Sequence, residues 1–394
     1  AQHRLTRDLI EADCLISPPE HALCYVSRAM AETKPLYYSE YLQLDRLLGA
    51  QVLESAKHGQ AVHDEHLFII VHQAYELWFR QMLWDLDAVL EVFGGKHVDE
   101  RALGRTVSLL DRIVEVQRLL IRQIDVLETM TPLDFLDFRE LLVPASGFQS
   151  VQFRLIENKL GLPAEARIPI HDASYLERFR KDERERIERS EGEPSLFRVV
   201  DRWLARTPFL QFGDWDFWRE YKIAVDAMLA RERERIESSE LVADAERKAL
   251  LARFGRTMAT FEALFDRDRY EAMIRAGERR LSWEALLAAL LINLYRDEPI
   301  LHLPFRFLTS LMDLDELVTT WRYRHALMAH RMIGTKIGTG GTSGSDYLRE
   351  TADKSKIFVD LFTLSTFFIP RSALPRLPRE VARKMSFQFT GGAD

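Results

Sequence analysis

A histidine occupies the middle of an apolar helical stripe near the C-terminal end of the chain. The stripe recurs at three- or four-residue steps and consists of Leu314, Leu317, Trp321, His325, Met328 and Met332. It predicts a helix over 314–333, with Asp313 as N-cap and Gly334 at its end. His325 is then either a core histidine satisfied by a carbonyl or carboxylate, or an axial haem ligand, which needs a neutral imidazole in an apolar wall. His330 lies five residues on, about 140° around the helix, so the pair cannot bind one metal.

A second histidine, His72, lies on the apolar face of a long helix predicted over 61–95. This face contains Leu67, Phe68, Val71, His72, Tyr75, Trp78, Phe79, Met82, Leu83 and Leu86. A polar ring in such a stripe needs a partner, which can be protein, water or substrate. His63 and His66 lie just upstream, but their spacing matches neither H-E-x-x-H nor the Glu-x-x-His pairs of helical di-iron proteins, so no metal site is predicted there.

An arginine, Arg139, is flanked by Phe135, Phe138 and Leu142. It can pair with an acid at the surface, or it can present a planar fork inside an apolar pocket and grip a carboxylate in two places. The residue pattern leaves both interpretations open.

A glycine-rich loop, Gly338–Gly344, contains the hydroxyl residues Thr339 and Ser343. It lacks the G-K-[ST] ending of a nucleotide-binding loop and follows no strand. Its glycines allow the backbone to approach a ligand closely. A lid over a substrate and a plain connector are both compatible with it.

Two other kinds of catalytic centre find no support. No G-x-S-x-G elbow of a serine hydrolase is present. The two cysteines, Cys14 and Cys24, form neither a disulfide framework nor a C-x-x-C metal or redox pair, and this favours a reducing cytoplasm. The chemistry is therefore expected to depend on a cofactor, which these residues alone do not identify.

The elements that must position these side chains are helical. Period-two stretches typical of strands are nearly absent, and further helices are predicted over 103–130, from after Gly147 to about Lys159, and over 346–368. The fold class is all-α. Charge-dense segments at 176–194 and 230–248 are predicted to be solvated helix faces, and the aromatic segment Gln211–Trp218 a corner between helices. We expect a single domain over 1–394, with a smaller helical insertion at about 165–255.

Composition narrows the class of protein. The chain has 394 residues, of which 47% are hydrophobic and 29% charged, which is enough for a large core. A net charge of -7 argues against a nucleic-acid partner. No apolar run approaches the roughly 18 residues of a membrane span, so a soluble, intracellular protein is expected.

Several motifs, in this order, resemble the tryptophan 2,3-dioxygenase family. The resemblance extends from about residue 36 to 375, which is most of the chain. Its motifs are Tyr-Ser-Glu-Tyr-Leu at 38–42, His-Asp-Glu-His-Leu-Phe from His63 through His72-Gln-Ala-Tyr-Glu-Leu-Trp-Phe, Asp-Phe-Arg-Glu at 137–140, Pro-Ala-Ser-Gly-Phe-Gln-Ser at 144–150, Trp-Arg-Tyr-Arg-His at 321–325, and Gly-Thr-Gly-Gly at 338–341. Thr342 departs from the serine that is usual in this family.

The resemblance implies a haem b cofactor. His325 would be the proximal ligand of its iron. Trp321 would lie in the cofactor pocket, and Ser146 would lie in the distal pocket near the haem.

The resemblance also implies how L-tryptophan binds. Arg139 would hold its carboxylate, Thr339 would hold mainly its ammonium group, and His72 would accept a hydrogen bond from the indole N–H. The ring would be sandwiched by Phe68, Phe135 and Leu142. Tyr38 and Tyr41 resemble the family's pair that reaches a neighbouring subunit's pocket, which implies a homotetramer.

The implied reaction is cleavage of the indole C2–C3 bond by O2 to give N-formylkynurenine, the first step of tryptophan catabolism by the kynurenine route. One alternative is a related haem oxygenase that acts on a substituted, for example β-methylated, tryptophan, or that inserts a single oxygen atom. Another is a haem sensor or carrier without catalysis, but a carrier has no use for the clamp of Arg139, Thr339 and His72.

Overall fold

The protein is seen in a computed structural model, in which residues 35–95, 98–168, 175–208, 210–239, 243–336 and 345–386 are described. The chain divides into two compact units, Ala1–Val52 and Leu53–Asp394. The described part of the first unit contains two short helices, α2 (Tyr38–Leu42) and α3 (Leu44–Leu48), with Gln43 between them in the left-handed region at φ 53°.

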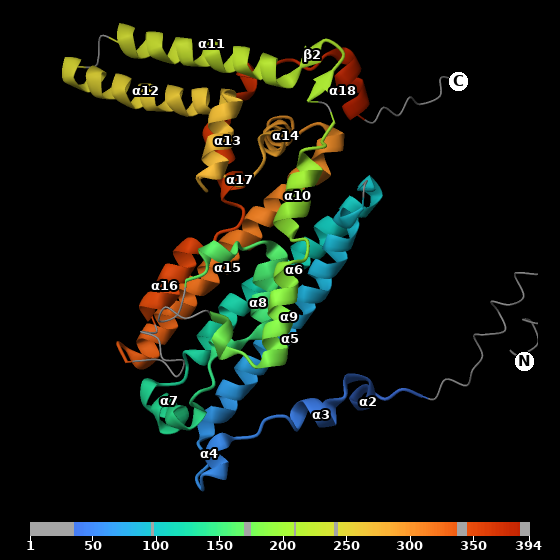
Figure 1. The fold of residues 1–394 in the computed structure, drawn as a ribbon, viewed down its shortest axis with the longest axis vertical. Helices are drawn as coiled ribbons and strands as arrows, with labels where there is room; N and C mark the ends of the chain where they lie inside the picture. The colour runs from blue at the N-terminus through green and yellow to red at the C-terminus, as the bar shows by residue number, and fades with distance from the viewer. Residues whose placement is uncertain are drawn as a thin grey trace, which may run out of the picture. The chain divides into compact units, whose positions relative to one another are not determined.

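The second unit is built from helices, and α5, α6 and α15 are the longest (Figure 1). Its helices are α4 (Glu54–Lys57), α5 (His63–Gly94), α6 (Glu100–Leu127), α7 (Pro132–Arg139), α8 (Val151–Leu160), α9 (Lys181–Glu191), α10 (Leu196–Leu204), α11 (Phe217–Ser238), α12 (Asp244–Phe265), α13 (Arg267–Arg275), α14 (Trp283–Leu294), α15 (His302–Ile333), α16 (Ser345–Lys354), α17 (Val359–Thr363) and α18 (Arg379–Met385). Short 3-10 turns connect some of them, including η1 (Glu140–Leu142) and η2 (Gly147–Gln149). The all-α prediction is confirmed.

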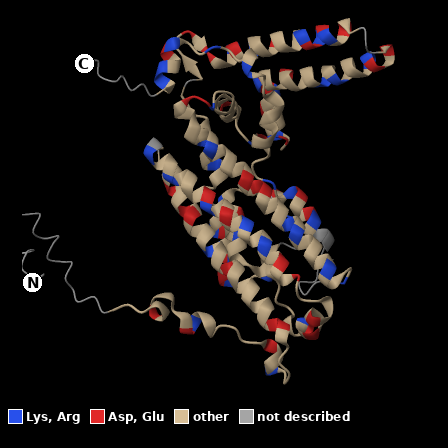
Figure 2. Cartoon of the chain, turned by 180° about the vertical axis from the view of Figure 1, so that it is seen from behind, with Lys and Arg blue, Asp and Glu red and all other residues tan. Residues whose placement is uncertain are grey.

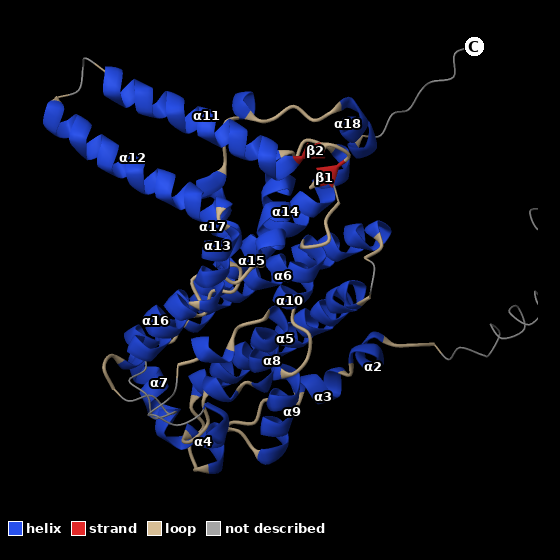
Figure 3. Ribbon diagram, turned by 45° about the horizontal axis from the view of Figure 1, so that its top comes forward, coloured by secondary structure: helices blue, strands red, loops and turns tan. Residues whose placement is uncertain are grey.

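Among the described residues, strand structure is limited to β1 (Gln211–Phe212) and β2 (Trp215–Asp216), a short antiparallel pair visible in Figure 3. This pair lies in the segment predicted to be an aromatic corner, and its aromatic side chains pack against the main core. Phe217 is fully buried there.

The core forms where α5 and α15 each pack along α6, and α14 packs beside α15. Helix α14 is apolar all round, because it is enclosed by the rest of the unit: every residue from Ala285 to Ile292 is buried. Helix α10 packs on both α5 and α14, although it falls inside the insertion predicted at about 165–255. The limits of that insertion stay a prediction.

The charge-dense segments are mainly helical where the structure describes them. Helix α9 falls within 176–194 and buries Ile187 and Ser190 on one side. Figure 2 shows both signs of charge along α11 and α12, which pack against each other. None of the described helices is long and apolar enough to cross a membrane.

Two helix boundaries differ from the prediction. Helix α15 begins at His302, so Asp313 lies inside the helix and is not its cap. The helix predicted over 346–368 was wrong, because α16 ends at Lys354 and a separate helix α17 begins at Val359. The predictions for α5, α6 and α8 are confirmed to within about three residues at each end, which is the usual uncertainty of helix ends.

Gly161 ends α8 at φ 105°, and a β-carbon there would lie 2.7 Å from Cβ of Phe197.

The break after α16 is fixed by a buried carboxylate on α15. The two oxygens of Asp315 accept hydrogen bonds from the backbone N–H groups of Ile357, at 3.0 and 3.1 Å, and Phe358, at 3.0 Å. Asp315 is 4% exposed, and burial raises its pKa. The carboxylate therefore takes the place of the intrahelical acceptors that a continuous helix would have supplied.

Replacing Asp315 with alanine is expected to lower the free energy of unfolding by roughly 2–4 kcal/mol, because two buried N–H groups lose their acceptor. Urea denaturation followed by circular dichroism measures this. Glu316→Ala is the matched control, since Glu316 is exposed and adjacent. Equal midpoints for the two variants would show that the carboxylate does not hold this segment.

Arg280 makes hydrogen bonds to segments that are far apart in the sequence. Its guanidinium donates to the carbonyl oxygen of Gly161 at 2.7 Å and to that of Ile357 at 2.8 Å. Its backbone N–H donates to Asp360 at 2.6 Å. The end of α8, the approach to α14 and the segment before α17 are thereby held together.

Candidate functional site

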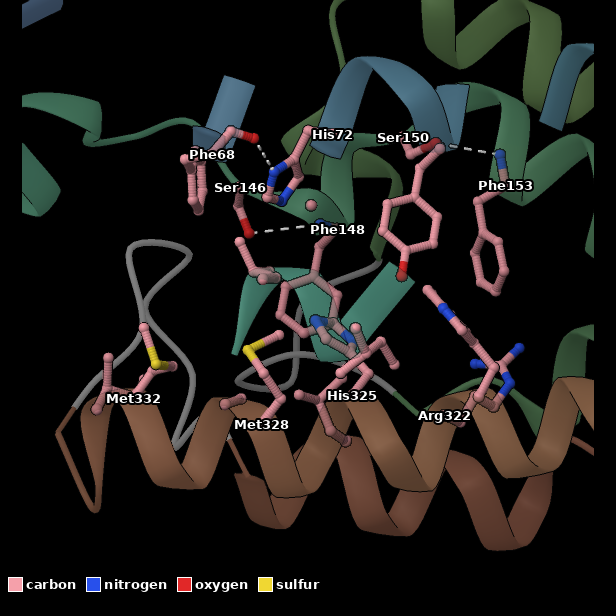
Figure 4. A pocket seen from close by; sticks show the side chains of 18 of the residues that line it. Phe68, His72, Ser146, Phe148, Ser150, Phe153, Arg322, His325, Met328 and Met332 are labelled. Atoms are coloured by element: carbon pink, nitrogen blue, oxygen red, sulfur yellow. Dashed lines mark hydrogen bonds between the residues drawn. The ribbon is translucent and has the colours of Figure 1, made fainter. Parts of the chain in front are cut away.

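A cavity of about 280 Å³ lies between α5, α6, α7, α8, α15 and α16 (Figure 4). This volume is just below the roughly 300–1,000 Å³ usual for small-molecule sites. The predicted site residues that line it are Phe68, His72, Phe135, Arg139, Ser146, Trp321 and His325. Segments that are separated by more than two hundred positions thus meet at one cavity.

His325 enters the cavity from α15. Its ring stacks on that of Trp321, one turn earlier, with centroids 5.4 Å apart and planes at 23°. Burial, together with smaller contributions from the nearby His72 and Arg322, lowers the pKa of His325 to about 4. Within the described part of the chain, no hydrogen bond to this ring is present. His325 is therefore a neutral imidazole with a lone pair available in the cavity, and this is what an axial iron ligand requires.

His72 lies on α5, and Figure 4 shows it across the cavity from His325. Its Nδ1 lies 2.7 Å from the carbonyl oxygen of Phe68. Since a carbonyl oxygen can only accept, we assign the ring proton to Nδ1, which leaves Nε2 as an acceptor. Burial lowers the pKa of His72, so the ring is neutral near pH 7. An N–H donor in the cavity would find an acceptor here.

An aromatic wall stands beside His72. The rings of Phe68 and Phe135 lie 5.6 Å apart at 27°, and Phe138 meets both edge-on at 5.5 and 5.4 Å. Phe138 is fully buried and supports the other two. Leu142 packs against the same cluster but does not line the cavity. The wall suits a flat apolar ring.

Arg139 is the last residue of α7. This helix begins with a capping box between Thr131 and Asp134, with Pro132 in the first turn, and its register turns the arginine inward. Arg139 is 8% exposed, and its Nη1 donates to Glu140 at 3.0 Å. Glu140 is largely exposed, at 75% of its side chain. The guanidinium thus lies in the apolar pocket, where a planar carboxylate can be held in two places.

Ser146 caps the turn η2 on the same side of the cavity as His72. Its Oγ accepts from the N–H of Phe148 at 3.4 Å, while its own N–H donates to Gln149 at 3.2 Å. The Ser146 hydroxyl proton can therefore be directed toward a ligand. Ser150 caps α8 in the same way and also lines the cavity.

An ion cluster that was not predicted from the sequence lies at the border of the cavity. Glu157 on α8 accepts from Arg154 at 2.8 Å and from Arg322, which lies 165 positions later. Burial opposes ionisation of Glu157, but Arg154, Arg322 and Arg167 outweigh it and lower its pKa to about 2. No local sequence motif predicts the ion pair of Glu157 and Arg322. The one signal in the sequence was that Arg322 lies three residues before His325, on the same side of the helix.

The structure gives no position relative to this cavity for three other predicted site residues. Thr339 lies outside the described residues. Tyr38 and Tyr41 belong to the first unit, where their side chains are 75% and 70% exposed. The roles expected for all three stay predictions.

These residues fit a haem. A neutral imidazole, an apolar wall and a hydroxyl converge on one cavity. No cluster of three or more His, Cys, Asp or Glu that could hold a bare metal ion occurs among the described residues. The site offers one nitrogen ligand. This is enough for a haem iron, whose other ligands come mainly from the porphyrin, and too few for an ion bound by side chains alone.

The fold and the cavity define an all-helical protein with the polar groups of a cofactor-dependent enzyme around one apolar site. The sequence matches the family described as tryptophan 2,3-dioxygenase over residues 25–368, and the chain belongs to this family. It is 48% identical over 354 residues to the tryptophan 2,3-dioxygenase of Alteromonas mediterranea, covering 90% of this chain and 98% of that protein. It is 51% identical over 345 residues to tryptophan 2,3-dioxygenase B of Danio rerio, covering 87% of this chain and 84% of the relative. The family prediction is confirmed.

Proposed function

We propose that this protein is a haem-dependent dioxygenase that cleaves the indole C2–C3 bond of L-tryptophan with O2 and releases N-formylkynurenine. Family membership and the names of relatives at about half identity support the reaction. The observation that carries the proposal is the meeting of His325, His72 and Arg139 at one apolar cavity. His325 would bind the haem iron, Arg139 would bind the carboxylate of tryptophan, and His72 would accept from its indole N–H.

His325 would hold the cofactor through its free ring nitrogen, with Trp321 stacked behind it to fix the ring orientation. Bound haem supplies the activation of O2, which no side chain of this site can supply. The apolar walls exclude water from the reacting atoms. Ser146 would offer a hydroxyl to the distal side.

The substrate would be held at both ends. Arg139 would bind the carboxylate, and Nε2 of His72 would accept from the indole N–H. Phe68 and Phe135 would hold the ring between these two contacts. Because the ends of tryptophan are fixed separately, the ring is oriented before reaction, which lowers the entropic part of the barrier. Thr339 is expected to add a contact to the ammonium group.

The protein is also proposed to act as a homotetramer in which Tyr38 and Tyr41 reach a neighbouring subunit. Their exposure on the first unit supports this, since large aromatic side chains left open to water are typical of contact surfaces. Light scattering of the purified protein measures the mass of the assembly. A monomer at micromolar concentration would contradict the proposal.

The reaction is tested by the mass of the product formed from L-tryptophan and 18O2 with haem-loaded, reduced protein. Two labelled oxygen atoms in a ring-opened product are expected. One labelled atom would establish a monooxygenase, and turnover of β-methyltryptophan but not tryptophan would change the substrate. Haem uptake with no turnover of any indole would favour a carrier.

Replacing His72 with alanine is expected to lower kcat roughly 10- to 100-fold, because one hydrogen bond that orients the ring is lost. Haem binding should not change, since the cofactor is held by His325. Steady-state kinetics and the haem absorption spectrum of the same preparation measure both effects. Loss of haem from His72→Ala would show that the assignment of this residue to the substrate is wrong. His66→Ala, on the same helix but outside this cavity, is the control.

A further inference from the structure

The ion pair between Arg322 and Glu157 lies inside the protein at the border of the cavity. The side chains of Arg322, Glu157 and Arg154 are 8%, 4% and 12% exposed. Both arginines line the cavity that His325 enters, and Figure 4 shows Arg322 and His325 rising from the same helix. The imidazole that is proposed to hold the cofactor therefore shares its cavity with fixed charges.

The pair stays charged over the whole range in which an enzyme works. A guanidinium does not lose its proton in a protein. The pKa of Glu157 lies at about 2, because the arginines outweigh the effect of burial. The charges are therefore permanent, and burial protects them from screening by salt.

Packing alone does not account for Arg322. Its guanidinium lies over the ring of Phe153, with Cζ 5.1 Å from the centroid, and its buried Nε has no hydrogen-bond partner among the described residues. A buried donor without an acceptor lowers stability. Replacing a buried ion pair with apolar side chains is often neutral or stabilising, so stability is weak grounds for keeping one. A role at the neighbouring site explains its presence better.

The field of Arg322 reaches His325. The two residues are three positions apart on α15 and so lie on the same side of the helix. Both side chains line the same cavity, so the charge of Arg322 lies near any group that His325 binds. A charge that acts on the imidazole also acts on an atom bound to it.

We propose that Arg322 and Glu157 set the reduction potential of the iron held by His325, with Arg322 favouring the ferrous state and Glu157 opposing it. Reduction adds one negative charge at the iron, so a fixed positive charge nearby stabilises the ferrous state and a fixed negative charge destabilises it. The inference rests on the proposed function, because that function supplies the haem. Arg322 and Glu157 then act on the iron through their charges and not through a bond to it.

The test measures the midpoint potential of haem-loaded protein by spectroelectrochemical titration. For Arg322→Gln, the ratio of ferrous to ferric protein at a fixed applied potential should fall about tenfold, a downward shift of about 59 mV for one electron. For Glu157→Gln, the ratio should rise by a similar factor. Arg322→Lys keeps the charge and should leave the ratio within about twofold of the unmodified protein. Arg324→Gln is the matched control, since Arg324 lies on the same helix and pairs with Asp125 and Glu128 outside the cavity.

The two glutamine variants are expected to shift the midpoint potential in opposite directions, and this separates the proposal from structural damage. Both glutamine variants break the same ion pair, so structural damage would move both potentials in one direction. Shifts of equal sign, no shift in either, or a shift in Arg322→Lys as large as in Arg322→Gln would overturn the proposal. If Arg322→Gln does not fold, Glu157→Gln alone must still raise the potential. Failure of the unmodified protein to take up haem would instead overturn the proposed function.

Discussion

Replacing His325 with alanine is expected to abolish retention of haem and, with it, turnover of tryptophan. His325 offers the one nitrogen that we assign to the iron, and its ring is neutral and held by Trp321. Groups that merely support a metal ligand are worth about 10- to 100-fold in affinity, so loss of the ligand itself should weaken binding by more than about a hundredfold. Titration of the apoprotein with haem, followed by absorption, measures the dissociation constant.

The control for this variant is His330→Ala. His330 lies on the same helix, five residues later, and is exposed. Haem affinity should not change in this variant. If His325→Ala kept its haem while His330→Ala lost it, the ligand assignment would be wrong. Circular dichroism of both apoproteins separates loss of ligand from loss of fold.

Replacing Arg139 with leucine is expected to lower kcat/KM for L-tryptophan by roughly 30-fold to several-thousand-fold. The estimate follows from the 2–5 kcal/mol lost when one partner of a buried, hydrogen-bonded charge pair is removed. Arg139 is 8% exposed, so water cannot replace it easily as a partner of the carboxylate. Most of the change should appear in KM, because the carboxylate does not react.

Tryptamine, which has no carboxylate, makes this prediction specific. The unmodified protein should discriminate strongly against it, and Arg139→Leu should treat the two substrates nearly alike. Glu140→Gln is the matched control, because Glu140 is largely exposed to water and its loss leaves the buried arginine in place. An equal loss of activity on tryptophan and tryptamine would show that Arg139 acts on the fold or the cofactor.

Periodicity was enough to predict the elements that carry the site. The apolar stripe around His72 predicted α5 to within two residues at its start, since a 3.6-residue period is read along one continuous helix. The second stripe, around His325, predicted that this histidine lies on an inward face. What the stripe could not decide was whether either histidine had a partner, because that depends on segments far away in the sequence.

The start of α15 shows where local signals fail. No side chain caps this helix at its N-terminus, and Pro304 in its first turn resembles a terminator. A proline is tolerated there because its missing N–H has no partner in the first turn anyway. Asp313 resembled a cap by type, but it is an interior residue. The pair of Glu157 and Arg322 was missed for a different reason, since no pattern within a helix encodes a contact across 165 positions.

The hydrogen bonds of Arg280 have a consequence for the order of events during folding. They connect Gly161 to Ile357, two positions that are almost half the chain apart. The cavity needs α5, α8, α15 and α16 together, so its walls come from segments on both sides of this connection. Closing such large loops is slow, and contacts of this kind form late. During synthesis, then, neither cofactor nor substrate has a complete binding place until the chain has emerged from the ribosome as far as Ile357, and a ligand that binds there stabilises the finished unit as a whole.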